Sequence, residues 1–515
     1  MVTAIQVKRQ AQRAIEKQRE RVAKVTPKTV ATLKQFAHKY FRHFLTTPES
    51  RFHTDLAPDL DAISANRGSK VARIAPRGSA KSTWSTLINV LKCALEGTER
   101  YIVIISDIQP NANKFLKAIK DEVEGNEALR SAYHHCRPGP VWREEAIELP
   151  NGVRIEALGK GGKIRGRRHR QYRPTLIILD DPQSFDDAYS ETQMEKDYHW
   201  LMSDVMKAGD PNTNFLVLGT ALADACIVCK LEKTPGWQFK RYQSIITEPT
   251  NMHLWLQWRE MLWRHEDPQR DEKAQAWYLQ NQVMMDEGHK VLWPERFPIV
   301  DLMKRRYSEG ERAFQSEEQG IPMPPGDAEW PMEYFDWPGF WFDDYPTDIT
   351  MSAYALDPSK GKESKQGDFQ ALGYAACNRA GTIFVEAWLE KMDSQSLMDF
   401  AVDRWSEKPA EAFAMETNCF QELLKIPLEK SVKAKNATLK LPLVEIINTV
   451  KKEVRIRRHT PYLAGRQYRF RNTPGTRMLV DMLKKFPFAE HDDGPDMLEM
   501  LLRVLIQLSH VKKVR

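Results

Sequence analysis

One stretch of this sequence has the residue types and spacing of a phosphate-binding loop. Residues 73–83 read RIAPRGSAKST and lie between an expected strand at 71–75 and an expected helix at 84–95. Backbone N–H groups around Gly78 and at the helix N-terminus would cradle phosphate oxygens. Lys81 would reach the β- and γ-phosphates, and the Ser82 hydroxyl would bind Mg²⁺. The predicted ATP-binding residues of the loop are Pro76, Arg77, Gly78, Ser79, Ala80, Lys81, Ser82 and Thr83. Alanines replace both glycines of the usual pattern, so for the loop alone a lysine-containing strand–helix turn remains the alternative.

A strand with two acids at its end supports the same chemistry. Residues 176–181 read LIILDD, an apolar strand that ends in carboxylates about 100 residues after the loop. Asp180 would hold Mg²⁺ through water, and Asp181 would orient the attacking water where a longer Glu is usual. A third strand, at 214–220, ends in Thr220, which could sense the γ-phosphate. Loop and acidic strand together predict a nucleotide hydrolase.

A second group of carboxylates lies in the C-terminal third of the chain. Each acid falls at the end of an expected element: Asp357, Asp368, Glu416, Asp493 and Asp496. Acids far apart in sequence can converge at one sheet edge, where hard oxygens suit Mg²⁺ or Mn²⁺. Two such metals clamp the attacking and leaving oxygens of a phosphodiester. Any single acid is better explained as a helix cap or a solvated end, but the whole set predicts a nuclease site. Whether Asp493 or Asp496 is the main ligand stays open.

The basic residues are concentrated in two runs. Residues 160–173 contain no acid, and residues 451–471 contain only Glu453, with tyrosines and a phenylalanine interspersed. Arginine suits phosphate contacts, and aromatic rings can stack on bases, although a single charged run is often only a solvated face. The residues expected to contact DNA are Lys163, Arg165, Arg167, Arg168, Lys451, Lys452, Arg455, Arg457 and Arg458.

The elements that must position these groups alternate along the chain. Short β-rich runs separated by helical stretches between about residues 70 and 250 predict a mostly parallel α/β sheet, and a second alternating pattern follows residue 346. The segment between them is helical and tryptophan-rich and ends in a Pro-rich break. We expect an N-terminal helical segment at 1–50, an ATPase core at 51–250, a helical linker at 251–345 and a nuclease domain at 346–515.

Composition excludes several classes of protein. The chain has 515 residues, a net charge of +6 and 42% hydrophobic residues, which is enough for several cores and too apolar for global disorder. No stretch approaches the roughly 18 to 20 apolar residues that cross a bilayer. The basic N-terminus lacks the apolar region of a signal peptide, and six cysteines are too few for a disulfide framework. We expect a protein that is neither secreted nor membrane-bound.

From about residue 50 to the end, the chain resembles the large terminase subunit of tailed bacteriophages. The loop at 75–83 looks like the family's variant phosphate loop with its early basic residue, Arg77, and residues 163–167 look like the Arg-Gly segment before the acidic strand. Thr220 falls at the coupling motif, and residues 291–295 and 314–319 resemble the region that leads into the linker. Residues 452–456 resemble the basic segment before the last acids. The sequence departs from the family at Asp181, where Glu is expected, and at Ala80, where Gly is frequent.

The resemblance implies a RecA-like P-loop ATPase domain followed by an RNase H-like nuclease domain. ATP hydrolysis with Mg²⁺ would drive double-stranded DNA through a portal ring into a procapsid, and a nuclease using Mg²⁺ or Mn²⁺ would cut concatemeric DNA. The implied partners are DNA, the portal and the small terminase subunit, with the chain acting in a homo-oligomeric ring. The implied location is the host bacterial cytoplasm, with transient docking at the procapsid portal vertex. The expected catalytic residues are Arg77, Asp181, Asp357, Glu416 and Asp496. Arg77 in cis is favoured as the arginine finger over an arginine from 165–170 acting in trans.

Two other functions remain as alternatives. A helicase–nuclease of repair or defence would combine a P-loop core with a carboxylate nuclease, but would normally need a second RecA-like lobe with its own motifs. A catalytically inactive DNA-binding prophage remnant would retain degenerate motifs, whereas Lys81, Asp180, Asp357 and Glu416 are intact.

Overall fold

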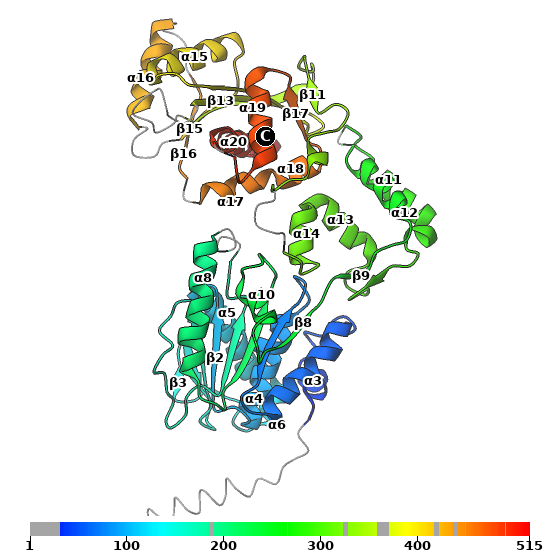
Figure 1. Ribbon diagram of the computed structural model, residues 1–515, viewed down its shortest axis with the longest axis vertical. Helices are drawn as coiled ribbons and strands as arrows, with labels where there is room; N and C mark the ends of the chain where they lie inside the picture. Colours follow the sequence, from blue (N-terminus) through cyan, green and yellow to red (C-terminus); the bar gives the residue numbers. More distant parts are fainter. Residues whose placement is uncertain are drawn as a thin grey trace, which may run out of the picture. The chain divides into compact units, whose positions relative to one another are not determined.

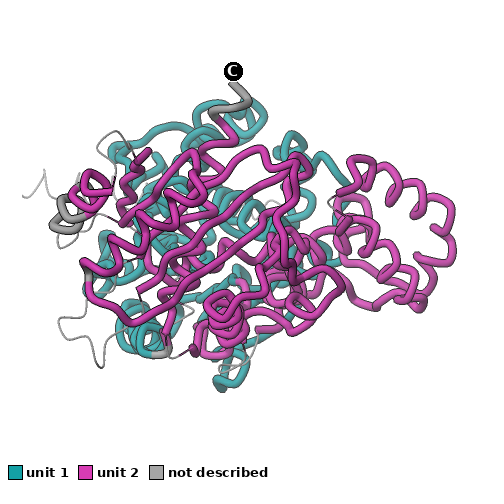
Figure 2. Tube along the Cα trace, turned by 90° about the horizontal axis from the view of Figure 1, so that it is seen from above, with its two compact units in different colours: residues 1–184, 192–219, 230–241 teal, residues 185–191, 220–229, 242–515 magenta. Residues whose placement is uncertain are grey.

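The computed structural model describes residues 31–514 except 185–186, 188–189, 265, 323–327, 358–369, 417–421, 436–440, 449 and 490. The chain divides into two compact units, which Figure 2 colours separately. The first comprises residues 1–184, 192–219 and 230–241, and the second comprises residues 185–191, 220–229 and 242–515. Each unit contains a large β-sheet of its own (Figure 1).

The sheet of the first unit has eight strands within the described part of the chain. They are β1 (Lys70–Ile74), β2 (Tyr101–Ser106), β3 (Val141–Trp142), β4 (Ala146–Glu148), β5 (Arg154–Gly159), β6 (Leu176–Asp180), β7 (Asn214–Gly219) and β8 (Gln238–Arg241). Their order is β3-β4-β5-β2-β6-β7-β1-β8, antiparallel from β3 to β5 and parallel from β5 to β8. Strands β2, β6 and β7 are wholly buried, as expected for parallel strands covered on both faces. The carboxyl ends of β1, β7 and β6 therefore lie side by side at one edge of the sheet.

Helices of the N-terminal half precede, connect or follow these strands. They are α2 (Leu33–Tyr40), α3 (Arg51–Ala65), the π-helical turn η1 (Thr83–Ile88), α4 (Asn89–Glu96), α5 (Gln109–Gly125), α6 (Glu127–Ala132), α8 (Glu191–Trp200), the π-helical turn η2 (Leu201–Val205), α9 (Met206–Ala208) and α10 (Ile227–Glu232). Helix α5 packs on β2 and β5, and α3 packs against α2 and η1. Helix α4 ends at Gly97 in the left-handed conformation that glycine adopts without strain.

From residue 242 the second unit continues with a helical segment that has its own aromatic core. Its elements are β9 (Ile245–Thr247), α11 (Met252–Leu262), α12 (Arg270–Met285), β10 (Lys290–Val291), α13 (Ile299–Glu309) and α14 (Glu311–Glu317). Trp255 and Trp258 of α11 are buried, and their indole N–H groups donate to the carbonyls of Met285 and Ala274 on α12 at 2.8 and 2.9 Å. These hydrogen bonds fasten the α11–α12 hairpin (Figure 1).

The sheet of the second unit has seven strands among the described residues. They are β11 (Trp341–Phe342), β12 (Ile349–Asp357), β13 (Gln370–Asn378), β14 (Ile383–Glu390), β15 (Ala412–Glu416), β16 (Leu443–Ile446) and β17 (Tyr468–Arg471). The order is β11-β17-β14-β13-β12-β15-β16, with β12, β13 and β14 antiparallel and the outer pairs parallel. The predicted α/β class, a parallel-rich sheet followed by a mixed one, is confirmed.

Helices cover both faces of the second sheet. Successive residues of a strand point to opposite faces, and here both faces carry apolar side chains that the helices bury. The short helix η3 (Met332–Tyr334) precedes the sheet, and the others are α15 (Ser394–Glu407), α16 (Glu422–Lys435), α17 (Lys452–Ile456), η4 (Arg457–His459), α18 (Thr460–Ala464), α19 (Pro474–Lys485) and α20 (Asp493–Val514). In β12, Ala353 and Ala355 face the core that includes α19 and α20, whereas Tyr354 and Leu356 face the core that includes α15 and α16. Small residues on one face let α20 approach the sheet closely.

Gly373 of β13 lies under α20 where this approach is close. A Cβ at this position would lie 2.0 Å from Met497 Sδ and 2.8 Å from Leu501 Cδ1, both on α20. Gly373→Val should therefore force the side chains of Met497 and Leu501 to move, destabilise the protein by about 1–3 kcal/mol and lower any nuclease activity that depends on the position of Asp496. The melting temperature and plasmid cleavage are the measurements, with Gly125→Ala as the control because a Cβ there meets no atom within 4 Å. An unchanged melting temperature in Gly373→Val would contradict the packing argument.

Candidate active sites

The predicted phosphate loop connects β1 to the helix that begins at Lys81. Gly78 has φ +77°, and Ala80 has φ +58° although it carries a Cβ. The left-handed conformation costs such a residue roughly 1–2 kcal/mol, so the surrounding structure must hold Ala80 in place. Left-handed residues in a turn direct successive N–H groups toward one side and create an anion-binding concavity. The strain therefore falls where a phosphate would be bound.

Asp180 lies at the carboxyl end of β6 and faces the helix that follows the loop. Its side chain is completely buried, and it accepts hydrogen bonds from Ser82 Oγ at 3.0 Å and Thr86 Oγ1 at 2.5 Å. Burial, together with the neighbouring charge of Asp181, raises the pKa of Asp180 to about 6. A serine hydroxyl beside a buried carboxylate is a donor set that fits Mg²⁺. The sequence predicted Ser82 and Asp180; it did not single out Thr86, although four residues after Ser82 is one helical turn.

Lys81 and Asp181 form an ion pair at the same edge. Lys81 Nζ lies 3.1 Å from Asp181 Oδ1 and 3.0 Å from Oδ2. Asp181 has φ +44°, and its N–H donates to the carbonyl of Leu218 on β7 at 2.9 Å. The Asp181 side chain is 46% exposed, so solvent reaches it. The predicted phosphate lysine and the predicted water-orienting acid are thus adjacent.

The remaining residues predicted to bind nucleotide lie in the loop, at the start of η1 or directly after β7. Pro76 and Ser79 are buried, Arg77 is exposed on the loop, and Thr83 begins η1. Thr220 directly follows β7, the strand between β1 and β6. The roles of Arg77 and Thr220 stay predictions.

The acids of the second sheet gather at the carboxyl ends of two adjacent parallel strands. Asp357 ends β12 and Glu416 ends β15, and the register pairs Leu356 with Met415 immediately before them. Asp493 and Asp496 occupy the first turn of α20, which packs on β12, and all four side chains are buried. The predicted Asp368 lies outside the described residues.

These acids influence one another's protonation. Burial raises the pKa of Asp357 well above its usual value, and the charges of Asp496, Asp493 and Glu416 raise it further against the opposing charge of Lys452. Burial raises the pKa of Asp496 to about 6, although Arg455 and Lys452 oppose the shift. Buried carboxylates that repel one another are stabilised either by protonation, which the raised pKa values favour, or by a nearby cation.

Two basic side chains of α17 supply positive charge at this site. Lys452 Nζ lies 2.7 Å from Asp492, 3.5 Å from Asp493 and 3.8 Å from Asp496. Arg455 binds both carboxylate oxygens of Asp496, at 2.5 and 3.0 Å. In this arrangement no three acidic, histidine or cysteine side chains of the described residues are grouped to hold a metal ion. The oxygen donors fit Mg²⁺ or Mn²⁺ chemically, but a metal would have to replace the contacts made by Lys452 and Arg455.

Glu499 is a buried acid of this region that the sequence analysis did not identify. It lies one turn after Asp496 on α20 and accepts from Arg458 at 2.8 Å. Arg503 also binds it, and Arg455 lies 3.5 Å away. The i, i+3 spacing from Asp496 is the signal that could have revealed it.

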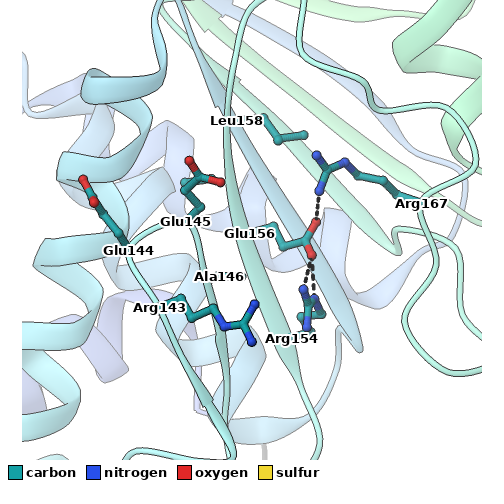
Figure 3. A pocket seen from close by; sticks show the side chains of 9 residues that line it. Arg143, Glu144, Glu145, Ala146, Arg154, Glu156, Leu158 and Arg167 are labelled. Carbon is teal, nitrogen blue, oxygen red and sulfur yellow. Dashed lines mark hydrogen bonds and ion pairs between the residues drawn. The ribbon is translucent and has the colours of Figure 1, made fainter.

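Most of the first basic run is neutralised by acids. Lys160 pairs with Asp197, Arg165 with Asp204 and Arg170 with Glu148. Arg167 Nη1 lies 2.8 Å from Glu156 Oε2, and Arg154 reaches the same carboxylate from the other side, in the wall of a pocket of about 340 Å³ (Figure 3). Within the predicted set, Lys163 and Arg168 are exposed and have no ion pair among the described residues.

The second basic run also folds largely onto acids. Arg455 is 5% exposed and bound to Asp496, which corrects the expectation that it faces DNA: its guanidinium compensates a buried carboxylate instead. Arg457 pairs with Glu329 at 3.0 Å and lies over the ring of Phe486. Lys451 and Arg458 are exposed. The run therefore contributes less positive surface than its composition suggests.

Comparison with known proteins gives structural similarity without sequence similarity. The sequence matches no family model and no curated protein. Among the solved structures similar to this chain are large terminases of bacteriophages. The large terminase of a thermophilic bacteriophage has a TM-score of 0.48 and 8% identity, and the match covers 89% of this chain and 100% of that chain. The large terminase ATPase domain of Thermus phage P74-26 has a TM-score of 0.30 and 11% identity, and the match covers 51% of this chain and 93% of that one.

A large terminase nuclease domain is also among the similar structures. That of bacterial virus Sf6 has a TM-score of 0.21 and 11% identity, and the match covers 30% of this chain and 88% of that one. No helix within the described ranges has the length and apolarity needed to span a membrane.

Proposed function

We propose that this chain is a viral DNA-packaging motor that combines an ATPase and a metal-dependent endonuclease. The observation that carries the proposal is that one chain places two clusters of charged side chains, each at the carboxyl edge of its own sheet. The first joins Lys81, Ser82 and Asp180, and the second joins Asp357, Glu416 and Asp496. A DNA substrate with a phosphodiester backbone accounts for the second site, and hydrolysis of ATP to drive movement of that DNA accounts for the first.

In the ATPase site, each residue has a separate task. Loop N–H groups and Lys81 bind the phosphates, which requires Lys81 to leave Asp181 when ATP enters. Ser82 and Asp180 would hold Mg²⁺, which when bound neutralises charge on the β- and γ-oxygens. Asp181, released from Lys81 and open to solvent, orients the attacking water. Arg77, exposed on the loop, neutralises charge that develops on the transferred phosphoryl group.

In the nuclease site, buried carboxylates would hold Mg²⁺ or Mn²⁺. The ligands would be Asp357, Glu416, Asp493 and Asp496. Asp368 stays a proposed ligand on the basis of the sequence alone. The metal supplies charge stabilisation at the scissile phosphodiester when it is bound. Lys452 and Arg455 neutralise Asp496, and Asp496 would bind a metal only after these contacts open.

The remaining proposals follow from the family resemblance. We propose double-stranded DNA, the portal ring and the small terminase subunit as partners, and action as a homo-oligomeric ring in the host cytoplasm and at the procapsid. The exposed residues Lys163, Arg168, Lys451 and Arg458 are the preferred DNA contacts. The large terminase of the thermophilic bacteriophage has been solved with ADP and with ATP-gamma-S, and the Sf6 nuclease domain with manganese. The same cofactors are proposed here on the chemistry of the donor sets.

A strand-separation test distinguishes the motor from a helicase–nuclease. We expect linear double-stranded DNA to stimulate ATP hydrolysis, and we expect ATP-dependent displacement of the third strand from a triplex without separation of a forked duplex. Unwinding of the fork would favour the helicase. Complete lack of ATP hydrolysis with and without DNA would favour the inactive remnant.

A further inference from the structure

His53, a residue of α3 far from the phosphate loop in sequence, contacts the backbone of that loop. It is 2% exposed, and its Nε2 lies 2.8 Å from the carbonyl oxygen of Ser79. Its Nδ1 accepts from the backbone N–H of Ser50 at 3.0 Å. Because Nδ1 accepts a hydrogen bond, the ring proton lies on Nε2 and is donated to Ser79. The two backbone contacts thus set the tautomer of a neutral imidazole.

The ring is also held in position by packing. It stacks on Trp84 of η1, with the ring centroids 5.5 Å apart and the planes inclined by 25°. Trp84 is buried near the start of the helix that follows the loop, and its backbone N–H donates to the carbonyl of Ala80 at 3.2 Å. His53 therefore contacts the loop through Ser79 and the following helix through Trp84.

The orientation of the Ser79 carbonyl determines where the next backbone N–H of the loop points. It belongs to the peptide that joins Ser79 to Ala80, between the left-handed residues Gly78 and Ala80. In a trans peptide the C=O and the N–H point in opposite directions, so a donor that fixes Ser79 O also fixes the direction of the Ala80 N–H. Ser79 O points toward α3, and the Ala80 N–H consequently points away from it. In a phosphate loop, such N–H groups are the ones that bind the anion.

We propose that His53 is a positioning residue that holds the phosphate loop in its anion-binding conformation through Ser79. The inference rests on the proposed ATPase function. His53 does not touch nucleotide; it acts by orienting the peptide before the strained Ala80. Without the Nε2–H donor, the buried carbonyl loses its partner and the peptide can rotate, which removes an N–H from the phosphate site.

Two substitutions separate this hydrogen bond from simple packing. His53→Phe keeps an aromatic ring to stack on Trp84 but cannot donate, whereas His53→Gln can donate through Nε2 and accept through Oε1. ATP affinity is measured by displacement of a fluorescent ATP analogue from the full chain, alongside the melting temperature. We expect His53→Phe and His53→Ala to weaken ATP binding about tenfold or more and His53→Gln to stay within about threefold of wild type.

The control is His43→Ala, because His43 is 53% exposed and contacts Glu122 rather than the loop. It should bind ATP as wild type does. Wild-type affinity in His53→Phe, or equal losses in the Phe and Gln variants, would overturn the proposal, as would a lowered melting temperature with unchanged affinity. The proposed function is tested separately: if wild type and Lys81→Ala bind ATP equally poorly, that function fails, whereas a loss confined to Lys81→Ala refutes only the role of His53.

Discussion

Lys81→Ala is expected to reduce the rate of ATP hydrolysis by at least about 100-fold, because the fixed charge both binds the phosphates and stabilises the charge that develops on the transferred phosphate in the transition state. Lys81 is almost fully buried at the loop and lies 3.0 Å from the carboxylate of Asp181. Alanine would remove the cation and leave Asp181 without this partner. Steady-state phosphate release with Mg²⁺ and ATP is the measurement. Nuclease activity should persist, because the nuclease acids belong to the other unit.

Controls separate a specific effect from a general loss of charge. Lys117→Ala removes a lysine that is 74% exposed on α5 and should leave the rate unchanged. Asp181→Asn should retain ATP binding and lose hydrolysis, since it removes only the group assigned to orient water. Near-wild-type hydrolysis in Asp181→Asn would refute that assignment, and near-wild-type hydrolysis in Lys81→Ala would refute the site.

Asp357→Asn is expected to abolish metal-dependent plasmid cleavage, with a loss of at least about 100-fold, while ATP hydrolysis continues. The Asp357 carboxylate is buried beside the charges of Asp496, Asp493 and Glu416, which raise its pKa well above the usual value. A divalent cation relieves this repulsion, and asparagine keeps the size of the side chain without its charge. Cleavage of supercoiled plasmid with Mn²⁺ or Mg²⁺ is the assay.

Thermal stability gives a second measurement for the same variant. A ligand that binds only the folded state at 100 times its Kd adds about 2.7 kcal/mol of stability. Mn²⁺ should therefore raise the melting temperature of wild type by several degrees and that of Asp357→Asn much less. Asp481→Asn, which changes a 68% exposed acid on α19, is the matched control and should respond as wild type does. Equal metal-induced shifts in wild type and Asp357→Asn would exclude Asp357 as a ligand.

Much of both sites could be predicted because their residues are placed by local structure. Asp180 and Asp357 each end an apolar strand, and Lys81 follows a loop between a strand and a helix. Parallel strands bring their carboxyl ends to one edge, so residue order along the chain already predicts which groups meet. The prediction of Ser82 beside Asp180 needed only this rule and agrees with the 3.0 Å contact between them.

Long-range packing determines which acids pair with the arginines of the second basic run, and the sequence alone did not predict these pairs. Arg455 and Arg457 are part of a basic run, yet their partners Asp496 and Glu329 lie 41 and 128 positions away along the chain. A charge that folding removes from water must find a partner, and for Arg455 the acid within reach depends on how α17 packs against α20. The number of basic residues in the run therefore overstates the positively charged surface that could contact DNA.

The sequence by itself predicted two kinds of chemistry, the alternation of elements and most of the residues proposed for each site, because these follow from neighbours along the chain. Only the tertiary structure placed His53 against Ser79, Thr86 on Asp180 and Arg455 on Asp496. Such contacts join residues whose identities are individually unremarkable, since histidine, threonine and arginine are tolerated in many environments. Their importance arises from burial, which makes each unpaired carbonyl or carboxylate costly and so fixes the partner that satisfies it.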